Sequence, residues 1–191
     1  MPVPKLVTER LILRELKSKD MFALCELFSD SETMKLYGGP VLNELQTKDL
    51  IKNTAFDFEK SNAVFWAITL TEDREFIGFI KIMSYQSYYF DASFASMGDL
   101  RNDPGLLTYI DKSGWETDYA LLKAYRKKGI MTEALKAVTS YCRTNGISPL
   151  YAKVNSLKNK ATIALLMNNK FTECLPQANH EGELGMIYKW Q

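Results

Sequence analysis

The chain contains little cysteine or histidine. It has three cysteines and one histidine among 191 residues. An odd number of distant cysteines without metal-ligand spacing argues against a disulfide framework and against a cysteine-based metal site. Cys25 and Cys142 fall on apolar faces of predicted helices, so we expect them to be buried free thiols of a reducing compartment.

An excess of charge and long apolar segments are also missing. Lysine and arginine together number 24 against 23 acidic residues, so no bulk attraction to nucleic acid or membranes is expected. No apolar run approaches the ~18 residues that suggest a membrane span, and the N-terminus resembles neither a signal peptide nor a transit peptide. We therefore expect a cytoplasmic protein that binds neither nucleic acid nor membranes.

The overall composition is that of a globular domain. Hydrophobic residues make up 46% of the chain and charged residues 25%, both ordinary values. A chain of this length suits one domain, and no repeat or low-complexity tract interrupts it. We expect a single domain over residues 1–191.

One stretch combines a strand, a basic turn and a helix. Polar and apolar side chains alternate over residues 115–122, which predicts a strand. Apolar side chains recur at helical spacing over residues 130–142. Between them, residues 126–129 carry an arginine and two lysines and end in glycine.

This order of elements suits an anion. The first amide groups of a helix have no partner within the helix, and the helix dipole makes that end attractive to negative charge. Glycine lets the backbone approach a ligand closely. The stretch therefore predicts a phosphate-binding turn, with a solvated basic turn as the alternative that local chemistry leaves open.

Several motifs resemble those of one enzyme family. Residues 126–131, Arg-Lys-Lys-Gly-Ile-Met, resemble the Arg/Gln-x-x-Gly-x-Gly/Ala acyl-CoA signature of the GNAT N-acetyltransferases. Residues 8–14 and 132–135 resemble the branch that acetylates the N-termini of ribosomal proteins (RimJ/RimL-like). Residues 154–162 are similar to the family's Val-x-x-x-x-Asn-x-Ala-Ser segment. Met131 departs from the family pattern, which prefers a small residue there.

The resemblance implies a mixed α/β (α+β) fold. Its twisted, mostly antiparallel sheet would have seven strands, would be flanked by helices, and would splay between two parallel central strands, residues 115–122 and 150–155. Residues 84–113 follow neither a strand nor a helix pattern, and loops of this length are often functional. We interpret them as an insertion that either covers the acceptor or makes a dimer contact, so monomer and homodimer both remain open.

The resemblance also implies acetyl-CoA as cosubstrate and no metal. Pyrophosphate would bind the amides of the basic turn, and the unpaired edge of the first central strand would bind the pantetheine arm. Asn159 would lie beside that arm, a role compatible with capping a helix. The cofactor-binding residues implied in this way are Tyr119, Ala120, Leu121, Leu122, Arg126, Lys127, Lys128, Gly129, Ile130, Met131, Thr132 and Asn159.

For catalysis the resemblance points to Glu116 as general base, with Asp118 as its rival. A carboxylate beside an apolar cleft has its pKa raised by desolvation, which suits a base, whereas a charge paired with a nearby lysine would have no catalytic role. Leu166 stands where many family members carry the tyrosine that reprotonates the thiolate. Tyr37 and Phe56 are candidate acceptor contacts by the resemblance, with ordinary packing as the alternative.

We therefore predict an acetyl-CoA-dependent N-acetyltransferase. It would transfer the acetyl group directly to a primary amine, either a protein N-terminus or a small molecule. A catalytically inactive acyl-CoA-binding module is the alternative, because the family tyrosine is missing and Met131 departs from the signature. A structural protein without a CoA site is a third, more remote reading.

Overall fold

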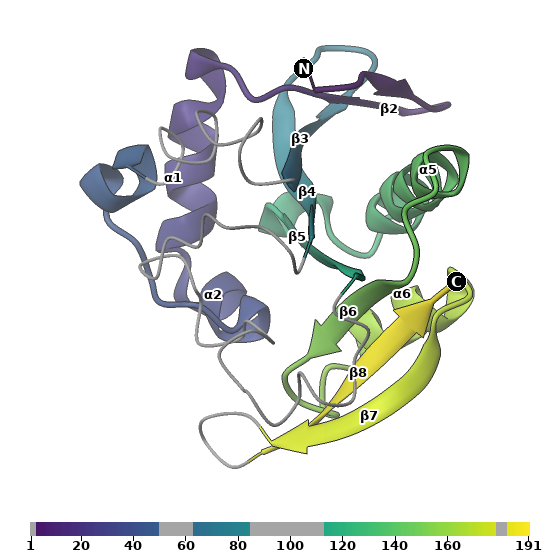
Figure 1. The fold of residues 1–191 in the computed structure, drawn as a ribbon. Coiled ribbons are helices and arrows are strands. Elements are labelled where there is room, and N and C mark those ends of the chain that lie inside the picture. The colour runs from purple at the N-terminus through teal and green to yellow at the C-terminus, as the bar shows by residue number, and fades with distance from the viewer. Residues whose placement is uncertain (1–2, 50–62, 85–112, 179–182) are drawn as a thin grey trace.

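The computed structural model describes residues 3–49, 63–84, 113–178 and 183–191. Its centre is an eight-stranded sheet with the strand order β1-β2-β3-β4-β5-β6-β8-β7 (Figure 1). The strands are β1 (Leu6–Val7), β2 (Leu11–Arg14), β3 (Ala63–Leu70), β4 (Phe76–Ser84), β5 (Trp115–Leu121), β6 (Leu150–Val154), β7 (Thr172–Ala178) and β8 (Leu184–Trp190). The helices are α1 (Met21–Ser29), α2 (Ser31–Tyr37), α5 (Ile130–Thr144) and α6 (Lys160–Asn168), with 3-10 turns at Ser18–Asp20 and Lys123–Tyr125. Residues 44–49 are also helical.

The sheet is mixed, as predicted, but it has eight strands where the sequence predicted seven. The additional strand is β1, which pairs with β2 at Leu6–Leu13 and Val7–Ile12. Two residues are too few to show an alternation of side chains, so only the pairing with β2 identifies them as a strand. All neighbouring strands are antiparallel except β5 and β6, which are parallel.

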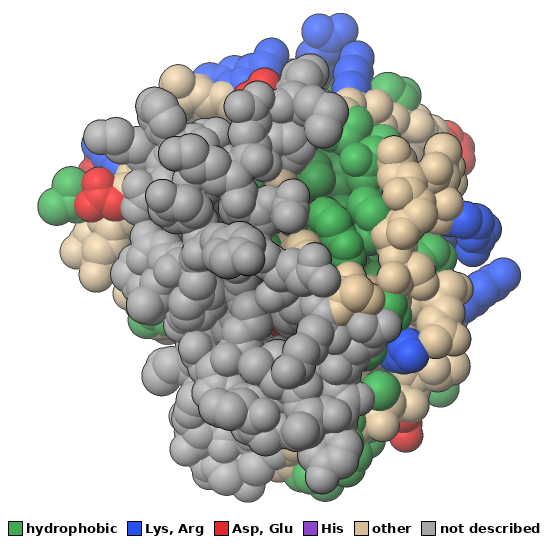
Figure 2. All heavy atoms as spheres, in the orientation of Figure 1, with side chains coloured by type: hydrophobic (Ala, Val, Ile, Leu, Met, Phe, Trp, Pro, Cys, Tyr) green, Lys and Arg blue, Asp and Glu red, His purple; other side chains and the backbone are tan. Residues whose placement is uncertain are grey.

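Helices cover both faces of the sheet (Figure 1). On one face, buried side chains of β3, β4 and β5 pack against α5 and α6 in the larger core cluster. On the other face, a smaller cluster contains Leu24, Phe28, Phe79 and Ala120 and lies under α1 and α2. Hydrophobic side chains fill the space between the sheet and α5 in the space-filling view (Figure 2). Because β4 contributes to both clusters, it is an interior strand, in agreement with its apolar sequence.

The two parallel strands separate soon after they meet. They are paired only at Trp115–Leu150 and Glu116–Tyr151, although β5 continues to Leu121 and β6 to Val154. On its other edge, β5 is paired with β4 along its whole length. The predicted splay is therefore present, and it leaves the β6-facing edge of β5 without a strand partner among the described residues.

Two further sequence predictions concern the insertion and the thiols. Apart from its terminal residues Ser84 and Ser113, the insertion lies outside the described residues, so its role remains a prediction. Cys142 is a free, buried thiol as expected, whereas Cys25 is only partly buried. Among the described helices, none is long and apolar enough to cross a membrane.

Candidate active site

Strand β5 presents alternate side chains to the two faces of the sheet. Tyr119 and Leu121 belong to the cluster on the α5 face, whereas Ala120 belongs to the cluster under α1 and α2. By the same alternation, Glu116 and Asp118 share the face of Ala120. The two candidate bases therefore lie side by side below helix α2.

The side chain of Lys81 lies close to these carboxylates and forms a charged cluster with them. The register of β4 on β5 places Lys81 directly opposite Asp118, and the Lys81 Nζ atom lies 3.0 Å from the Asp118 Oδ2 atom. Burial opposes the charge of Lys81, but Tyr37, Asp118 and Glu116 together raise the pKa of its ammonium group. The Glu116 residue is 5% exposed. Glu116 is thus a buried carboxylate next to an ion pair that already contains its rival.

Tyr37, the last residue of α2, reaches the same group from above. Its ring packs edge-on against Phe28 and Phe79, with centroids 6.4 and 5.8 Å apart. Burial raises the pKa of the Tyr37 hydroxyl; Lys81 opposes this shift, and the negative charge of nearby carboxylates adds to it. The hydroxyl is buried and forms no hydrogen bond with good geometry to the part of the chain that the structure describes. Phe56, the other predicted acceptor contact, lies outside the described residues.

The backbone of the basic turn is shaped for an anion. Lys127 and Gly129 both have left-handed backbone conformations, with φ of 60° and 74°, and Gly129 is the N-cap of α5. The Glu133 N–H donates to the Gly129 carbonyl at 3.1 Å and begins the helix ladder. The amides of residues 130–132 therefore have no partner within the helix. Left-handed residues in such a turn create a concave set of N–H donors.

The side chains of the turn have different surroundings. Lys127 and Lys128 are exposed, and the Lys128 Nζ atom lies over the Tyr125 ring at 5.6 Å. The side chains of Ile130 and Met131 are buried in the larger core cluster. Met131 therefore departs from the family signature without placing its side chain at the turn.

Arg126, a predicted cofactor ligand, has side-chain partners at the end of β5 and on α2. Its Nε atom donates to the Leu121 carbonyl at 3.0 Å, and its Nη2 atom donates to the Thr33 hydroxyl on α2. The two acidic residues of that helix start, Asp30 and Glu32, each have an oxygen 4.0 Å from the guanidinium. The guanidinium thus contacts α2 and the end of β5.

Three residues that hold the turn were not assigned a role from the sequence. Glu133 accepts hydrogen bonds from the Thr8 hydroxyl at 2.6 Å and from the Arg10 Nε atom at 2.7 Å. The Arg10 Nη1 atom donates in turn to the Lys128 carbonyl at 3.0 Å. The two RimJ/RimL-like motifs, residues 8–14 and 132–135, are therefore opposite sides of one contact. The presence of both motifs in one sequence was the signal from which this contact could have been predicted.

This contact leads to a pH-dependent prediction. Burial raises the pKa of Glu133, but hydrogen bonds from Thr8 and Arg10 outweigh that effect and hold it below its ordinary value of 4.5. Because the folded-state pKa is lowered, the stabilisation is present above pH 4.5 and is lost as the pH falls through the lowered value. Glu133→Gln should reduce the free energy of unfolding at pH 7 by about 1–3 kcal/mol.

Urea unfolding of the wild-type protein and of Glu133→Gln at pH 7 and at pH 3 measures the difference in their free energies of unfolding. This difference should be smaller at pH 3. Glu44→Gln is the matched control, because the Glu44–Lys48 pair is an exposed pair on one helix. That change should alter stability by less than about 0.5 kcal/mol. A Glu133→Gln effect of equal size at both pH values would contradict the assigned ionisation.

The remaining predicted residues have clear structural roles. The Asn159 side-chain oxygen accepts from the Thr162 N–H at 3.2 Å and caps α6, so the capping role is confirmed. The cap uses only that oxygen, which leaves the amide NH2 group as the part available to a ligand. Leu166 is fully buried in the core. Burial raises the pKa of the Cys142 thiol to about 12, which excludes it as a nucleophile near neutral pH.

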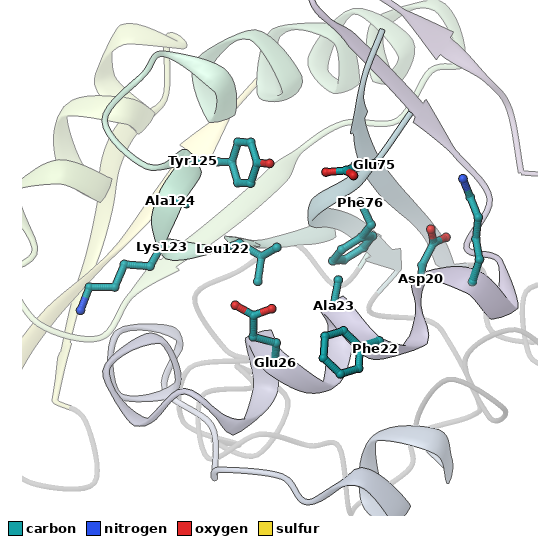
Figure 3. A pocket seen from close by; sticks show the side chains of 11 residues that line it. Asp20, Phe22, Ala23, Glu26, Glu75, Phe76, Leu122, Lys123, Ala124 and Tyr125 are labelled. Carbon is teal, nitrogen blue, oxygen red and sulfur yellow. The ribbon is translucent and has the colours of Figure 1, made fainter. Parts of the chain in front are cut away.

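An open cleft of about 840 Å³ lies on the α1 side of the sheet, beyond the end of β5 (Figure 3). Aromatic side chains, including Phe22, Phe76 and Tyr125, and the carboxylates of Glu26 and Glu75 line it. Leu122, which also lines it, is six residues from Glu116, roughly 20 Å along an extended strand. The cleft is therefore separate from the candidate catalytic group.

The splayed sheet is the fold of solved acetyltransferases, and the match to a family model gives the class of the chain, an acyltransferase that uses acetyl-CoA. The family model described as an acetyltransferase (GNAT) domain matches residues 10–172. The chain belongs to this GNAT acetyltransferase family. No curated protein sequence matches the chain significantly.

Solved structures with the same fold extend over nearly the whole chain. An acetyltransferase from Agrobacterium tumefaciens is 21% identical with a TM-score of 0.73, covering 100% of this chain and 96% of its own. RimL, a ribosomal L7/L12 alpha-N-protein acetyltransferase in complex with coenzyme A, is 17% identical with a TM-score of 0.69, covering 100% and 97%. The aminoglycoside acetyltransferase AAC(6')-Ib, also in complex with coenzyme A, is 12% identical with a TM-score of 0.69, covering 95% and 94%. At these identities the similarity shows the fold alone.

Proposed function

We propose that this chain is a single-domain N-acetyltransferase that transfers the acetyl group of acetyl-CoA directly to a primary amine. A protein N-terminus is our first candidate for the acceptor, and a small-molecule amine is the second. The motifs at residues 8–14 and 132–135, which contact each other through Glu133, support a RimJ/RimL-like enzyme. The cysteine content supports a cytoplasmic location. An inactive acyl-CoA-binding module remains the alternative.

The residues around the turn fit acetyl-CoA. The turn offers the amides of residues 130–132, two exposed lysines, and a glycine where, among the described residues, an added Cβ would meet only the Arg10 Nη2 atom, at 3.5 Å. In our proposal these groups hold the pyrophosphate. The edge of β5 that has no strand partner among the described residues, from Tyr119 to Leu121, would hold the pantetheine arm together with Leu122, the residue after the strand. Acetyl-CoA supplies an activated acetyl thioester.

The observation that carries the catalytic proposal is the ion pair between Lys81 and Asp118. That contact occupies one oxygen of the Asp118 carboxylate. Glu116, buried one pleat away, is therefore our candidate for the base that accepts the proton of the attacking amine. We propose that Tyr37 contacts the acceptor, since its hydroxyl is buried beside the same group.

The structural neighbours differ in the acceptors that they acetylate. One of them acts on a ribosomal protein N-terminus and another on an aminoglycoside, and both have this fold. Because one fold hosts several acceptors, the acceptor must be found by experiment.

Two measurements test the proposal. Calorimetric titration with acetyl-CoA should show binding at one site per chain. CoA release should then be followed with peptides that begin with Ser, Ala, Thr or Met, with spermidine, and with kanamycin. We expect turnover of at least one N-terminal peptide, abolished when that peptide carries an acetylated N-terminus. Binding without turnover of any amine would favour the inactive module, and no binding would contradict the proposal.

A further inference from the structure

Helix α2 bridges the gap that opens between β5 and β6. The strands are paired only at their first residues, and each runs on for several residues beyond that point. In Figure 1, α2 lies on the same side of the sheet as α1, next to this gap. Side-chain contacts attach one end of α2 to the end of β5 and its other end to the residue that follows β6.

Arg126 makes the attachment to β5. Its guanidinium donates both to the Leu121 carbonyl, the last residue of β5, and to the Thr33 hydroxyl in the first turn of α2. Asp30, the N-cap of α2, accepts from the Thr33 N–H at 2.8 Å and lies 4.0 Å from the guanidinium. The planar fork of an arginine can hold two such partners at fixed positions.

A second contact at this end is weaker. The Lys123 Nζ atom lies 2.6 Å from the Glu32 Oε2 atom, but both side chains are mostly exposed, at 70% and 57%. An exposed pair of this kind contributes little to stability. The attachment at this end therefore depends mainly on Arg126 and Thr33.

Asn155 makes the attachment to β6. Its Nδ2 atom donates to the carbonyl of Tyr37, the last residue of α2, at 3.2 Å. The next residue, Gly38, has φ of 87°, and a Cβ there would lie 2.0 Å from the same Nδ2 atom. The close approach of Asn155 to the end of α2 therefore requires glycine at that position.

We propose that α2 is a strap across the splay, and that Arg126 and Asn155 are the positioning residues that hold it. Arg126 thus acts through α2 and is not a ligand of the cofactor phosphate. The strap sets the separation of the two strands and holds Tyr37 above the Lys81–Asp118 pair. This inference rests on the proposed function, because it concerns the geometry of acetyl transfer.

Loosening the strap should affect turnover more than cofactor binding. A misplacement of about 1 Å at a reacting centre can cost about 100-fold in rate, whereas the turn amides remain in place. Arg126→Met, Thr33→Val and Asn155→Asp should each lower kcat by at least about tenfold. The acetyl donor is acetyl-CoA, and the acceptor is the fastest amine of the panel above. The Kd for acetyl-CoA should stay within about threefold, less than 1 kcal/mol.

Thr33→Ser is the matched control. It keeps the hydroxyl of Thr33, whereas Thr33→Val removes the hydroxyl and keeps the side-chain volume. It should retain nearly full turnover. Arg126 and Thr33 should also act as one unit, so that Arg126→Met combined with Thr33→Val is no slower than Arg126→Met alone.

The alternative gives the opposite pattern. If Arg126 binds phosphate, Arg126→Met raises the Kd for acetyl-CoA at least about tenfold, while Thr33→Val leaves kcat unchanged. That result would contradict the proposal that α2 is a strap held by Arg126.

Amide hydrogen exchange gives a readout that does not depend on activity. The Gly38 and Gly39 amides donate to the Met34 carbonyl at 2.8 and 3.2 Å, and they should lose protection in Asn155→Asp. Unchanged protection overturns the strap even if the enzyme is inactive. Failure of the wild-type protein to bind acetyl-CoA or to acetylate any amine contradicts the proposed function instead.

Discussion

Replacing Glu116 by glutamine should lower turnover by at least about 100-fold, because general-base catalysis typically contributes 100-fold to 10,000-fold. Glutamine keeps the shape of the side chain and most of its hydrogen bonds but cannot accept the proton of the amine. The Kd for acetyl-CoA should hardly change, since Glu116 lies at the start of β5 and the turn follows its end. Steady-state CoA release and a calorimetric titration measure the two quantities.

The pH profile strengthens this test. Turnover of the wild-type protein should rise with pH as the base loses its proton, and that limb should be absent from Glu116→Gln. Asp118→Asn is the comparison variant. It breaks the ion pair with Lys81, so it should lower the melting temperature. Its turnover should still rise with pH as that of the wild-type protein does. If Glu116→Gln keeps more than about a third of the wild-type turnover, well above the range for a lost base, Asp118 or a water relay takes that role.

Replacing Gly129 by glutamate should weaken acetyl-CoA binding by at least about tenfold, or ~1.4 kcal/mol. The new carboxylate would lie at the N-terminus of α5, where the amides and the helix dipole favour an anionic ligand. Among the residues that the structure describes, a Cβ at this position meets only the Arg10 Nη2 atom, at 3.5 Å, so these residues leave room for the side chain. Calorimetric titration with acetyl-CoA measures the loss.

Two control variants separate charge from backbone strain. Any residue other than glycine is strained at φ of 74°, at a cost of roughly 1–2 kcal/mol. Gly129→Gln carries this strain and the bulk of glutamate but no charge, and Gly129→Ala carries the strain alone. We expect glutamine to weaken binding less than glutamate does. Equal affinity of a folded Gly129→Glu variant and the wild-type protein would remove the phosphate site from the turn.

The local elements of the site could be predicted from the sequence. The alternation over residues 115–122 and the helical spacing that follows depend on neighbouring residues only, and both elements are present as β5 and α5, although β5 ends one residue earlier, at Leu121. The sequence also predicted that Gly129 lets the backbone approach a ligand closely, whereas its φ of 74° is known only from the structure. The family resemblance led from these elements to the splayed sheet.

The partners of individual side chains could not be predicted in this way. Arg126 lies in a motif that predicted a phosphate contact, yet its nearest partners are Thr33 on α2 and the carbonyl of Leu121. Thr33 is 93 residues away along the chain, and no local pattern links the two positions. The same holds for Asn155, whose contact with the end of α2 depends on where the splay brings β6.

The sequence by itself therefore determined the strand, the turn and the helix, because hydrophobic periodicity and the conformational freedom of glycine act over a few residues. Only the tertiary structure shows which residues of β4 lie opposite Glu116 and Asp118. The register of β4 on β5 places Lys81 opposite Asp118 and Met83 opposite Glu116. A shift of one residue in that register would turn Lys81 to the other face of the sheet. Strand register is set by packing over the whole sheet, and so the charge next to each carboxylate is a property of the fold.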